Sequence, residues 1–412
     1  MRFPLLYIDP GTGSMLFSVF IGIAAAASFG LRAVFLKCKF LFTGGKAKTD
    51  EKRLPFVIFS DHKRYWNVFK PIADEAEKRG LKTVYFTASP DDPALTADYK
   101  NVTAEYLGEK NKPYARLNLL SADILLSTTP GLDVLQWKRS KGVKWYVHVP
   151  HTVDDLSGYR MFGLDYYDAV LTSGKNQVDL IRTIESLRPS IAKKELVTVG
   201  SPQLDTMIAK RKAATESIAR ENEKKIVLVA PSWGKSGILS RYGEKLLCAL
   251  EKTPYKIIVR PHPQTIVSEQ DILKPLTQKF TSIEWNYDND NFDVLSRSDI
   301  LITDFSGIIF DYSLVFDKPL IYADTSFDTL PYDADWLSEP MWSLRVLPKL
   351  GVELKESDFE NIGSVIYRAM ASTDLKAGRD EVRAECWEHQ GEAAARIVDY
   401  IENKKEELEC KH

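Results

Sequence analysis

Two stretches of the second half decide the fold class: Arg260-Pro261-His262-Pro263, and Thr303-Asp304-Phe305-Ser306-Gly307-Ile308-Ile309-Phe310-Asp311-Tyr312 about forty residues later. Each follows a short apolar run, at residues 256–259 in the first case and 299–302 in the second. Short apolar runs that stop at polar turns are typical of buried strands in a parallel sheet. The two stretches therefore indicate an α/β fold.

The polar turns after these runs are expected to meet at one edge of the sheet. Ligands of open α/β sheets bind just beyond the carboxyl ends of the strands. Residues 307–314 have helical spacing, so Ser306 is placed to begin a helix whose free N–H groups attract anions. Arg260, His262 and this helix start are predicted to form a crevice for a phosphorylated ligand.

Strand-like and helix-like segments alternate along most of the chain. With 412 residues it is long enough for two domains, and the alternation is typical of βαβ units. We predict two Rossmann-like domains facing each other across a cleft, at residues 54–200 and 226–376. A polar helix and linker at 201–225 joins them, and a helical segment at 377–412 returns toward the first domain.

Individual elements are predicted from the same pattern. Strands are expected at residues 56–59, 83–86, 124–126, 145–149, 169–171, 196–199, 226–229, 257–259, 283–285, 300–302 and 320–322. Helices are expected at residues 65–79, 175–186, 242–250, 291–297, 306–314, 359–371 and 379–407.

The first 53 residues have a different character. Residues 14–31 carry no charge, and basic residues cluster after them but not before them. Such a segment predicts a single transmembrane helix followed by a basic linker, with the rest of the chain in the cytoplasm. A cleaved signal peptide is the alternative, although the basic cluster opposes export.

Composition limits the function classes. A formal net charge of −2 argues against a nucleic-acid partner, which calls for a basic surplus. The four cysteines are scattered without metal-ligand spacing, so neither a disulfide framework nor a zinc site is expected. No Walker A or GxGxxG motif is present, which disfavours a kinase or a dehydrogenase.

Histidines stand at three predicted strand ends. His62 follows the first strand, His151 follows the strand at 145–149, and His262 follows the strand at 257–259. A neutral imidazole can accept a proton near neutral pH, so His151 is a candidate general base, the alternative being a histidine that bonds its own loop. His148 falls inside its strand and is expected in the core. The prolines beside His262 stiffen its turn and remove N–H groups, which leaves the imidazole and Arg260 to contact a ligand.

Several further residues of the second domain could contact phosphates or a nucleoside. Ser306 could cap its helix and also bind phosphate, and Gly307 would allow close approach. Asp304 could accept from a ribose hydroxyl or hold a loop, and Asp311 is expected to face an arginine or a backbone amide. The glycine-containing loop after the strand at 226–229 offers Ser232 and Lys235.

The motifs together resemble the CDP-glycerol glycerophosphotransferase family, the teichoic-acid primases and polymerases. The matching segments are His151-Thr152, Gly200-Ser201-Pro202-Gln203-Leu204-Asp205, Pro231-Ser232-Trp233, Arg260-Pro261-His262-Pro263, Thr303-Asp304-Phe305-Ser306 through Phe310-Asp311-Tyr312, and Lys318-Pro319-Leu320-Ile321-Tyr322. The chain departs from the family pattern at Gly307, where a second serine is found, and at Gln203 and Gly234, where arginines are found. It also lacks a glycine between His151 and Thr152, so the identity of the group carried on CDP stays open.

The resemblance implies a fold, a reaction and roles. The fold is the GT-B architecture, and the reaction is transfer of glycerol phosphate, or a related polyol phosphate, from a CDP-linked donor to a hydroxyl of a lipid-linked or membrane-associated acceptor in cell-surface polymer biosynthesis. His151 would take the acceptor proton, while His262, Ser306 and the helix amides stabilise the pyrophosphate. The domain at 54–200 would bind the acceptor and the domain at 226–376 the nucleotide donor. Arg260, Asp304, Gly307, Ser232 and Lys235 are expected on the donor side, with His62 and Asp311 as further candidates. No cofactor is required, and a divalent metal stays an option without an evident ligand set.

Two alternatives remain at this point. The same crevice would suit a UDP- or GDP-sugar in a glycosyltransferase or a nucleotide-sugar epimerase of GT-B architecture. A non-catalytic, membrane-anchored scaffold that keeps the fold is the other alternative. The resemblance favours an enzyme at a bacterial-type cell membrane with its catalytic domains in the cytoplasm.

Overall fold

The computed structural model describes residues 53–214, 224–288, 290–323 and 328–410. The chain divides into two compact units, Met1–Arg53 and Leu54–His412, and both sheets belong to the second unit. The expected transmembrane segment at 14–31 lies outside the described residues. Across the described ranges, no helix is long and apolar enough to cross a membrane.

The first sheet contains seven parallel strands in the order β3-β2-β1-β4-β5-β6-β7. Their bounds are β1 Leu54–Ser60, β2 Thr83–Thr87, β3 Val102–Tyr106, β4 Ser121–Ser127, β5 Gly142–His148, β6 Ala169–Thr172 and β7 Glu195–Thr198. The strand order reverses between β1 and β4. Such a reversal opens a crevice at the carboxyl ends of the strands, where ligands of doubly wound sheets bind.

The second sheet repeats this design with six parallel strands in the order β10-β9-β8-β11-β12-β13. Its strands are β8 Ile226–Val229, β9 Lys256–Val259, β10 Glu284–Trp285, β11 Ile300–Thr303, β12 Leu320–Ala323 and β13 Gly351–Leu354. The reversal falls between β8 and β11. The loops after β8, β9 and β11 therefore meet at one edge.

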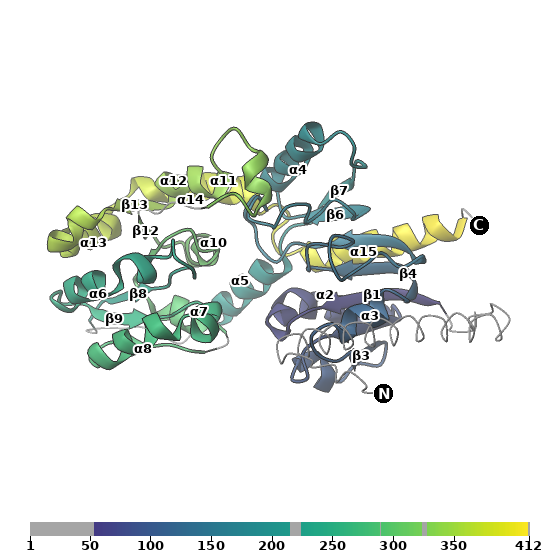
Figure 1. Cartoon of the computed structure of the whole chain (residues 1–412), viewed down its shortest axis with the longest axis horizontal. Coiled ribbons are helices and arrows are strands. Elements are labelled where there is room, and N and C mark those ends of the chain that lie inside the picture. Colours follow the sequence, from purple (N-terminus) through teal and green to yellow (C-terminus); the bar gives the residue numbers. More distant parts are fainter. Residues whose placement is uncertain (1–52, 215–223, 289, 324–327, 411–412) are drawn as a thin grey trace, which may run out of the picture. The chain divides into compact units, whose positions relative to one another are not determined.

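Helices and turns connect the strands (Figure 1). The first sheet is connected by η1 Lys63–Tyr65, α2 Trp66–Arg79, η2 Pro93–Thr96, α3 Lys112–Leu117, α4 Lys175–Leu187 and α5 Pro202–Ala214. The second has α6 Ile238–Glu251, α7 Pro263–Ser268, α8 Gln270–Lys279, α9 Phe292–Arg297, α10 Ile308–Phe310, the π-helical η3 Asp311–Val315, η4 Asp333–Trp336, α11 Trp342–Arg345, α12 Leu347–Leu350, η5 Glu356–Asn361, α13 Ile362–Ala371 and α14 Asp374–Cys386. The last helix is α15 Ala393–Cys410.

The strand β8 shows why these runs become central strands. Ile226 and Leu228 belong to one hydrophobic core, whereas Val227 and Val229 belong to another on the opposite face of the sheet. All four are buried, because successive side chains of a strand point to opposite faces and both faces are covered. A continuous apolar run is the sequence signature of this double burial.

The last two helices pack on different sheets. Val382 and Cys386 of α14 lie in a core of the second sheet, whereas Ile397 and Ile401 of α15 lie in a core of the first. In Figure 1, α15, in yellow, runs beside the strands of the first sheet. The prediction of a single helical stretch at 379–407 is wrong, because a non-helical segment separates α14 from α15.

Asp205 of α5 stabilises the segment between α14 and α15 through hydrogen bonds. Its carboxylate accepts from Trp387 Nε1 at 3.0 Å and from the backbone N–H of Ala393 at 3.1 Å. Gly391 has φ +84°, which suits a residue without a side chain. The aspartate of the Gly-Ser-Pro-Gln-Leu-Asp segment therefore fixes the course of the chain between α14 and α15.

Candidate functional site

Loops from both sheets line one cleft of about 760 Å³. From the first sheet come residues that follow β1, β4 and β5, and from the second come residues that follow β8, β9 and β11. The predicted residues His151, Arg260, His262, Ser306, Gly307 and Asp311 are all in its lining. This lining agrees with the prediction that the polar turns after these strands converge on one crevice.

His151 is held by a loop and by aromatic rings. Its Nδ1 lies 3.1 Å from Thr128 Oγ1, the Tyr65 ring centroid lies 4.8 Å from its own, and Tyr159 stacks at 6.1 Å. Burial, and next the positive charge of Arg64, lower its pKa to about 4, while the Thr128 backbone carbonyl acts in the opposite sense. The ring is neutral at pH 7. In the tautomer whose Nδ1–H donates to Thr128, the Nε2 lone pair is left to accept a proton.

His148 lies behind this arrangement in the core, as expected. It is fully buried in β5, and its Nε2 lies 3.1 Å from the Tyr159 hydroxyl. Tyr159 is thus fixed on one side by His148 and stacks on His151 with its ring. The buried histidine therefore positions an aromatic wall of the cleft.

His262 presents a hydrogen-bond donor. It is the N-cap of α7, and its Nδ1 accepts from the backbone N–H of Gln264 at 3.0 Å. Burial, and next the charges of Arg64 and Arg260, lower its pKa to about 4. Since Nδ1 is an acceptor in a neutral ring, the proton is on Nε2, which can donate to a ligand oxygen.

Arg260 stands beside this histidine. Its Nη1 donates to Asn286 Oδ1, and burial lowers its pKa. A guanidinium stays charged in proteins, so the cleft has a fixed cation next to His262.

The helix start at Ser306 and Gly307 differs from the prediction. The N-cap is Gly307, α10 begins at Ile308, and no side-chain cap bond is formed, so the expected Ser306 cap is wrong. The Ser306 carbonyl instead accepts from the backbone N–H of Ile309 at 3.1 Å. Both residues line the cleft, which leaves the Ser306 hydroxyl free of a capping role.

Asp311 opens the π-helical turn η3. Its carboxylate accepts from Asn291 Nδ2 at 3.1 Å, so its partner is a side-chain amide and not the expected arginine or backbone amide. Burial raises its pKa to about 6. A cleft carboxyl with this pKa changes charge close to neutral pH.

Four predicted residues do not line the cleft. Asp304 is buried and accepts from the backbone N–H groups of Ser232, at 2.8 Å, and Ile238, at 2.9 Å. This geometry is that of a loop-holding residue, and the placement gives no support to a ribose-binding role. Ser232 is buried in the same loop and Lys235 is exposed. His62 accepts from the backbone N–H of Arg64 at 3.2 Å and caps η1.

The lining contains charged residues that the sequence prediction missed. Asp61 and Arg64 flank His62 on the loop after β1, and Asp154 follows His151. Burial, and next the charge of Asp155, raise the pKa of Asp154 to about 7. The Arg64 charge lowers the pKa of both His151 and His262, so it acts on histidines that come from both sheets.

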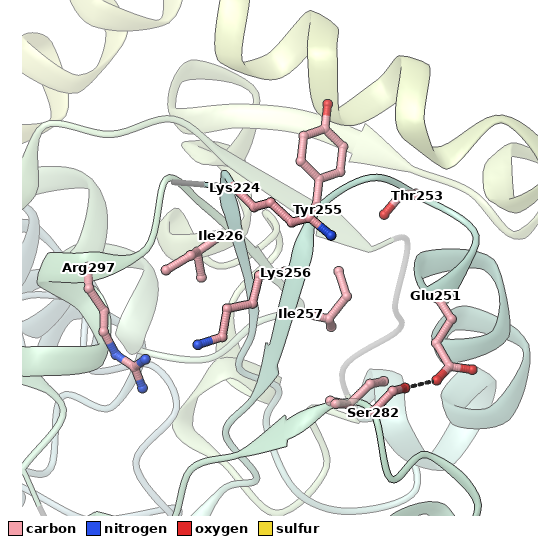
Figure 2. A pocket seen from close by; sticks show the side chains of 10 residues that line it. Lys224, Ile226, Glu251, Thr253, Tyr255, Lys256, Ile257, Ser282 and Arg297 are labelled. Carbon is pink, nitrogen blue, oxygen red and sulfur yellow. Dashed lines mark hydrogen bonds between the residues drawn. The ribbon is translucent and has the colours of Figure 1, made fainter. Parts of the chain in front are cut away.

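A second hollow of about 780 Å³ lies at the opposite ends of the strands (Figure 2). It is lined by the first residues of β8 and β9, among them Ile226 and Lys256. Lys256 Nζ pairs with Glu284 at 2.8 Å, and Ser282 donates to Glu251. These side chains already bond one another, and none of the predicted site residues lines this hollow. We therefore place the candidate site in the first cleft.

A comparison of sequences decides the family. Residues 170–403, more than half of the chain, match the family described as CDP-Glycerol:Poly(glycerophosphate) glycerophosphotransferase. The chain belongs to this family. The matched region contains His262, Arg260 and Ser306, whereas His151 and Arg64 precede it.

Individual relatives agree with this assignment. The teichoic acid glycerol-phosphate primase of Bacillus subtilis (strain 168) is 30% identical over 134 residues, which are 31% of this chain and 33% of that protein. The chain thus matches about a third of the length of this curated relative.

Solved structures show the same fold. The wall teichoic acid polymerase TagF superposes with a TM-score of 0.58 at 15% identity, over 93% of this chain and 98% of that one. A UDP-N-acetylglucosamine 2-epimerase from Listeria monocytogenes gives 0.52 at 12% identity, over 86% and 97%. Two parallel α/β sheets of GT-B type are therefore confirmed for the described residues.

Proposed function

We propose that this chain transfers glycerol phosphate from CDP-glycerol to a hydroxyl of a membrane-associated acceptor in teichoic acid biosynthesis. Family membership supports the donor and the reaction. The observation that carries the proposal is the pair of neutral histidines, His151 and His262, which line one cleft from the two sheets.

The proposed reaction is a displacement at the β-phosphorus. His151 Nε2 takes the acceptor proton, and the freed oxygen attacks the β-phosphorus of CDP-glycerol. The bond between this phosphorus and the bridging oxygen breaks, CMP leaves with the electron pair, and the glycerol phosphate is joined to the acceptor as a phosphodiester. The proton on His151 then passes to solvent.

The cleft offers the groups that this step needs. A positioned general base contributes typically about 10²- to 10⁴-fold in rate. His262 Nε2–H and the guanidinium of Arg260 face the charge that develops on the pyrophosphate, where removal of one aimed donor costs typically about 3–4 kcal/mol. A dianionic donor would also raise the pKa of both histidines, because it opposes the repulsion from Arg64 and Arg260.

We propose that these cations and donors act without a cofactor. Arg64 and Arg260 supply fixed positive charge, and phosphoryl transfer depends mainly on positioning and electrostatics. In the described part of the chain, no group of three or more His, Cys, Asp or Glu is arranged to hold a metal ion. Activity in buffer with EDTA, at the same rate as in buffer with Mg²⁺, is the expected result.

We also propose that the chain works at the cytoplasmic face of a bacterial-type membrane. The donor is a soluble nucleotide and the acceptor is lipid-linked, so an enzyme at this surface meets both. The uncharged segment at 14–31 and the basic residues that follow support this placement.

The test is CMP release from CDP-glycerol by the purified full chain. His151→Ala and His262→Ala are each expected to remove nearly all of it. His389→Asn is the control, because His389 is exposed, does not line the cleft and has φ +51°, which asparagine tolerates. Wild-type rates in both cleft variants would contradict the proposal.

A further inference from the structure

The bend Thr152-Val153-Asp154, directly after His151, is held by two consecutive side-chain amides. It belongs to neither a helix nor a strand, so its backbone carbonyls need partners from elsewhere in the chain. Gln177 Nε2 donates to the first and third of these carbonyls, at 2.9 Å each, and Asn176 Nδ2 donates to the middle one at 2.8 Å. Two side chains therefore fix three successive residues of the cleft lining.

The start of α4 explains how these amides reach the bend. α4 begins at Lys175, so Asn176 and Gln177 are its second and third residues. A glutamine at the third position commonly turns back toward the chain before its helix, and Gln177 Oε1 accepts from the backbone N–H of Ser173 at 2.8 Å. This bond fixes the orientation of the amide, because a flipped amide would point its N–H groups at another N–H group and its oxygen at two carbonyls.

The start of α4 is itself anchored to the end of α14 and to the residues after it. The Ser173 carbonyl accepts from the backbone N–H of Glu388 at 2.9 Å. A Cβ on Gly174 would lie 2.4 Å from the Glu385 carbonyl, so the absence of a side chain allows this close approach. The two amide side chains are also buried. They therefore act from a rigid support, as groups that position a site must.

His151 is thus held from two sides. The Thr128 hydroxyl contacts Nδ1 of its ring, whereas the two amides fix the main chain that begins at the next residue. Contact with the ring alone would leave its Nε2 free to move with the bend. A displacement of about 1 Å at a reacting group can cost about 100-fold in rate. The amides therefore bear on the geometry of proton transfer.

We infer that Asn176 and Gln177 are positioning residues of the transfer reaction, which hold the 152–154 bend so that His151 Nε2 meets the acceptor hydroxyl. This inference rests on the proposed function, in which His151 takes the proton of that hydroxyl. Neither amide side chain lines the cleft, so both act through the main chain next to His151. Their loss should therefore lower kcat and leave donor binding nearly unchanged.

The pH profile separates positioning of His151 from a contribution to folding alone. Burial, and next the charge of Arg64, lower the pKa of His151 to about 4. If the bend loosens, water reaches the ring and its pKa rises toward the ordinary value, so the acid limb of kcat/KM moves to higher pH. Loss of Gln177 leaves in place the charged and titratable neighbours of the ring, which are Arg64, Tyr65, His148 and Tyr159. A substitution that only weakens the fold leaves the acid limb at its wild-type pH.

The experiment uses the full chain, with CDP-glycerol as donor and dodecyl glycerol phosphate as the acceptor probe. Gln177→Met keeps the length of the side chain and removes its hydrogen bonds, so kcat should fall about 10- to 100-fold while the donor KM stays within about threefold. Asn176→Leu frees one carbonyl of the bend in place of two and should cause a smaller fall in kcat. In both variants the acid limb should move to higher pH.

Ser140→Ala is the matched control for stability. Ser140 is buried just before β5, at the opposite end of that strand from His151. Its hydroxyl donates to the Leu120 carbonyl at 2.6 Å and accepts from the backbone N–H of Gly142 at 3.1 Å. The control should lower Tm and keep the wild-type kcat and acid limb when both are measured well below its Tm.

Failure of the inference and failure of the proposed function give different results. Transfer by the wild type, with a wild-type kcat and an unmoved acid limb in Gln177→Met, would overturn the inference alone. Equal falls of kcat in Gln177→Met and Ser140→Ala would also overturn it. If Gln177→Met does not fold, Asn176→Leu decides between these outcomes.

Absence of transfer by the wild type would defeat the proposed function. The hold of the amides on His151 is then measured without turnover, from the pKa of isotope-labelled histidine rings in the full chain. The His151 signal is assigned by its absence in His151→Ala, and its pKa should be higher in Gln177→Met than in the wild type. An equal pKa in the two proteins would show that the amides do not position His151.

Discussion

The backbone N–H of Gln264 donates to His262 Nδ1 across 3.0 Å, and this bond fixes the tautomer of the imidazole. The neutral ring must then carry its proton on Nε2. One histidine therefore has two separable tasks: Nδ1 caps α7, and Nε2–H is available to the cleft. Asparagine and glutamine have side-chain amides of different length, so each can take over one of these two tasks of the imidazole.

His262→Asn and His262→Gln are expected to differ. Asparagine places an oxygen near the position of Nδ1 and is a good N-cap, so the variant should keep its Tm but lose about 10²- to 10³-fold in kcat. Glutamine places an N–H near the position of Nε2 and should keep more activity at a lower Tm. Thermal unfolding and CMP release measure both properties, and equal losses of kcat in the two variants would contradict the assigned tautomer.

Arg64→Ala is expected to move the acid limb of the pH profile. Burial and the Arg64 charge lower the pKa of His151 to about 4, and His151 must be neutral to act as a base. Activity of the wild type should therefore fall only as pH drops toward about 4. Without the Arg64 charge the pKa rises, so the limb moves to higher pH. Arg64→Lys keeps the positive charge, so the acid limb of its kcat/KM profile should stay at the wild-type pH. An acid limb that does not shift in Arg64→Ala would contradict the electrostatic effect of Arg64 on His151.

Asp304→Asn should destabilise the loop between β8 and α6. The Asp304 carboxylate accepts from two backbone N–H groups, those of Ser232 and Ile238. Asparagine brings an amide donor toward one of these N–H groups, and a buried group left unbonded costs typically about 1–3 kcal/mol. Denaturant unfolding measures the loss. Asp98→Asn, at an exposed position, is the control, and equal stability of the two variants would argue against the loop-holding role.

Gly307→Ser is expected to fold normally. A Cβ built on Gly307 meets only Thr152 Oγ1 at 3.8 Å, and φ −58° suits any residue. The added hydroxyl restores the serine of the family pattern, so the donor KM should fall by up to about tenfold. Gly237→Ser is the contrast, because its Cβ would lie 2.7 Å from the Ser232 carbonyl and should lower Tm. A higher donor KM in Gly307→Ser would show that the glycine is required for close approach.

The central strands could be predicted from the sequence, as could the edge strands β7 and β10, whereas the edge strands β3 and β13 could not. β8, β9 and β11 are buried on both faces and read as apolar runs. β3 and β13 lie at the edges of their sheets, and Val102–Tyr106 alternates buried or half-buried positions with exposed ones. An edge strand has fewer neighbours to cover it, so charged residues are tolerated there and the apolar run is lost.

The site could be predicted in part for a related reason. His151, His262 and Arg260 follow buried strands directly, so the strand ends locate them. On the loop after β1, five consecutive polar residues, Ser60 to Arg64, follow the strand, and the pattern does not tell which of them face the cleft. The prediction selected His62, but the short turn η1 uses that side chain as its cap and brings Asp61 and Arg64 into the lining.

The most direct test of the account follows the β-phosphorus of the donor. The full chain is incubated with CDP-glycerol labelled at the β-phosphate and with dodecyl glycerol phosphate, and the products are separated. If an acceptor hydroxyl attacks the β-phosphorus, the label moves to the acceptor, CMP is released without label, and His151→Ala abolishes both. Label that stays on the nucleotide as CDP, or transfer at the wild-type rate in His151→Ala, would contradict the account.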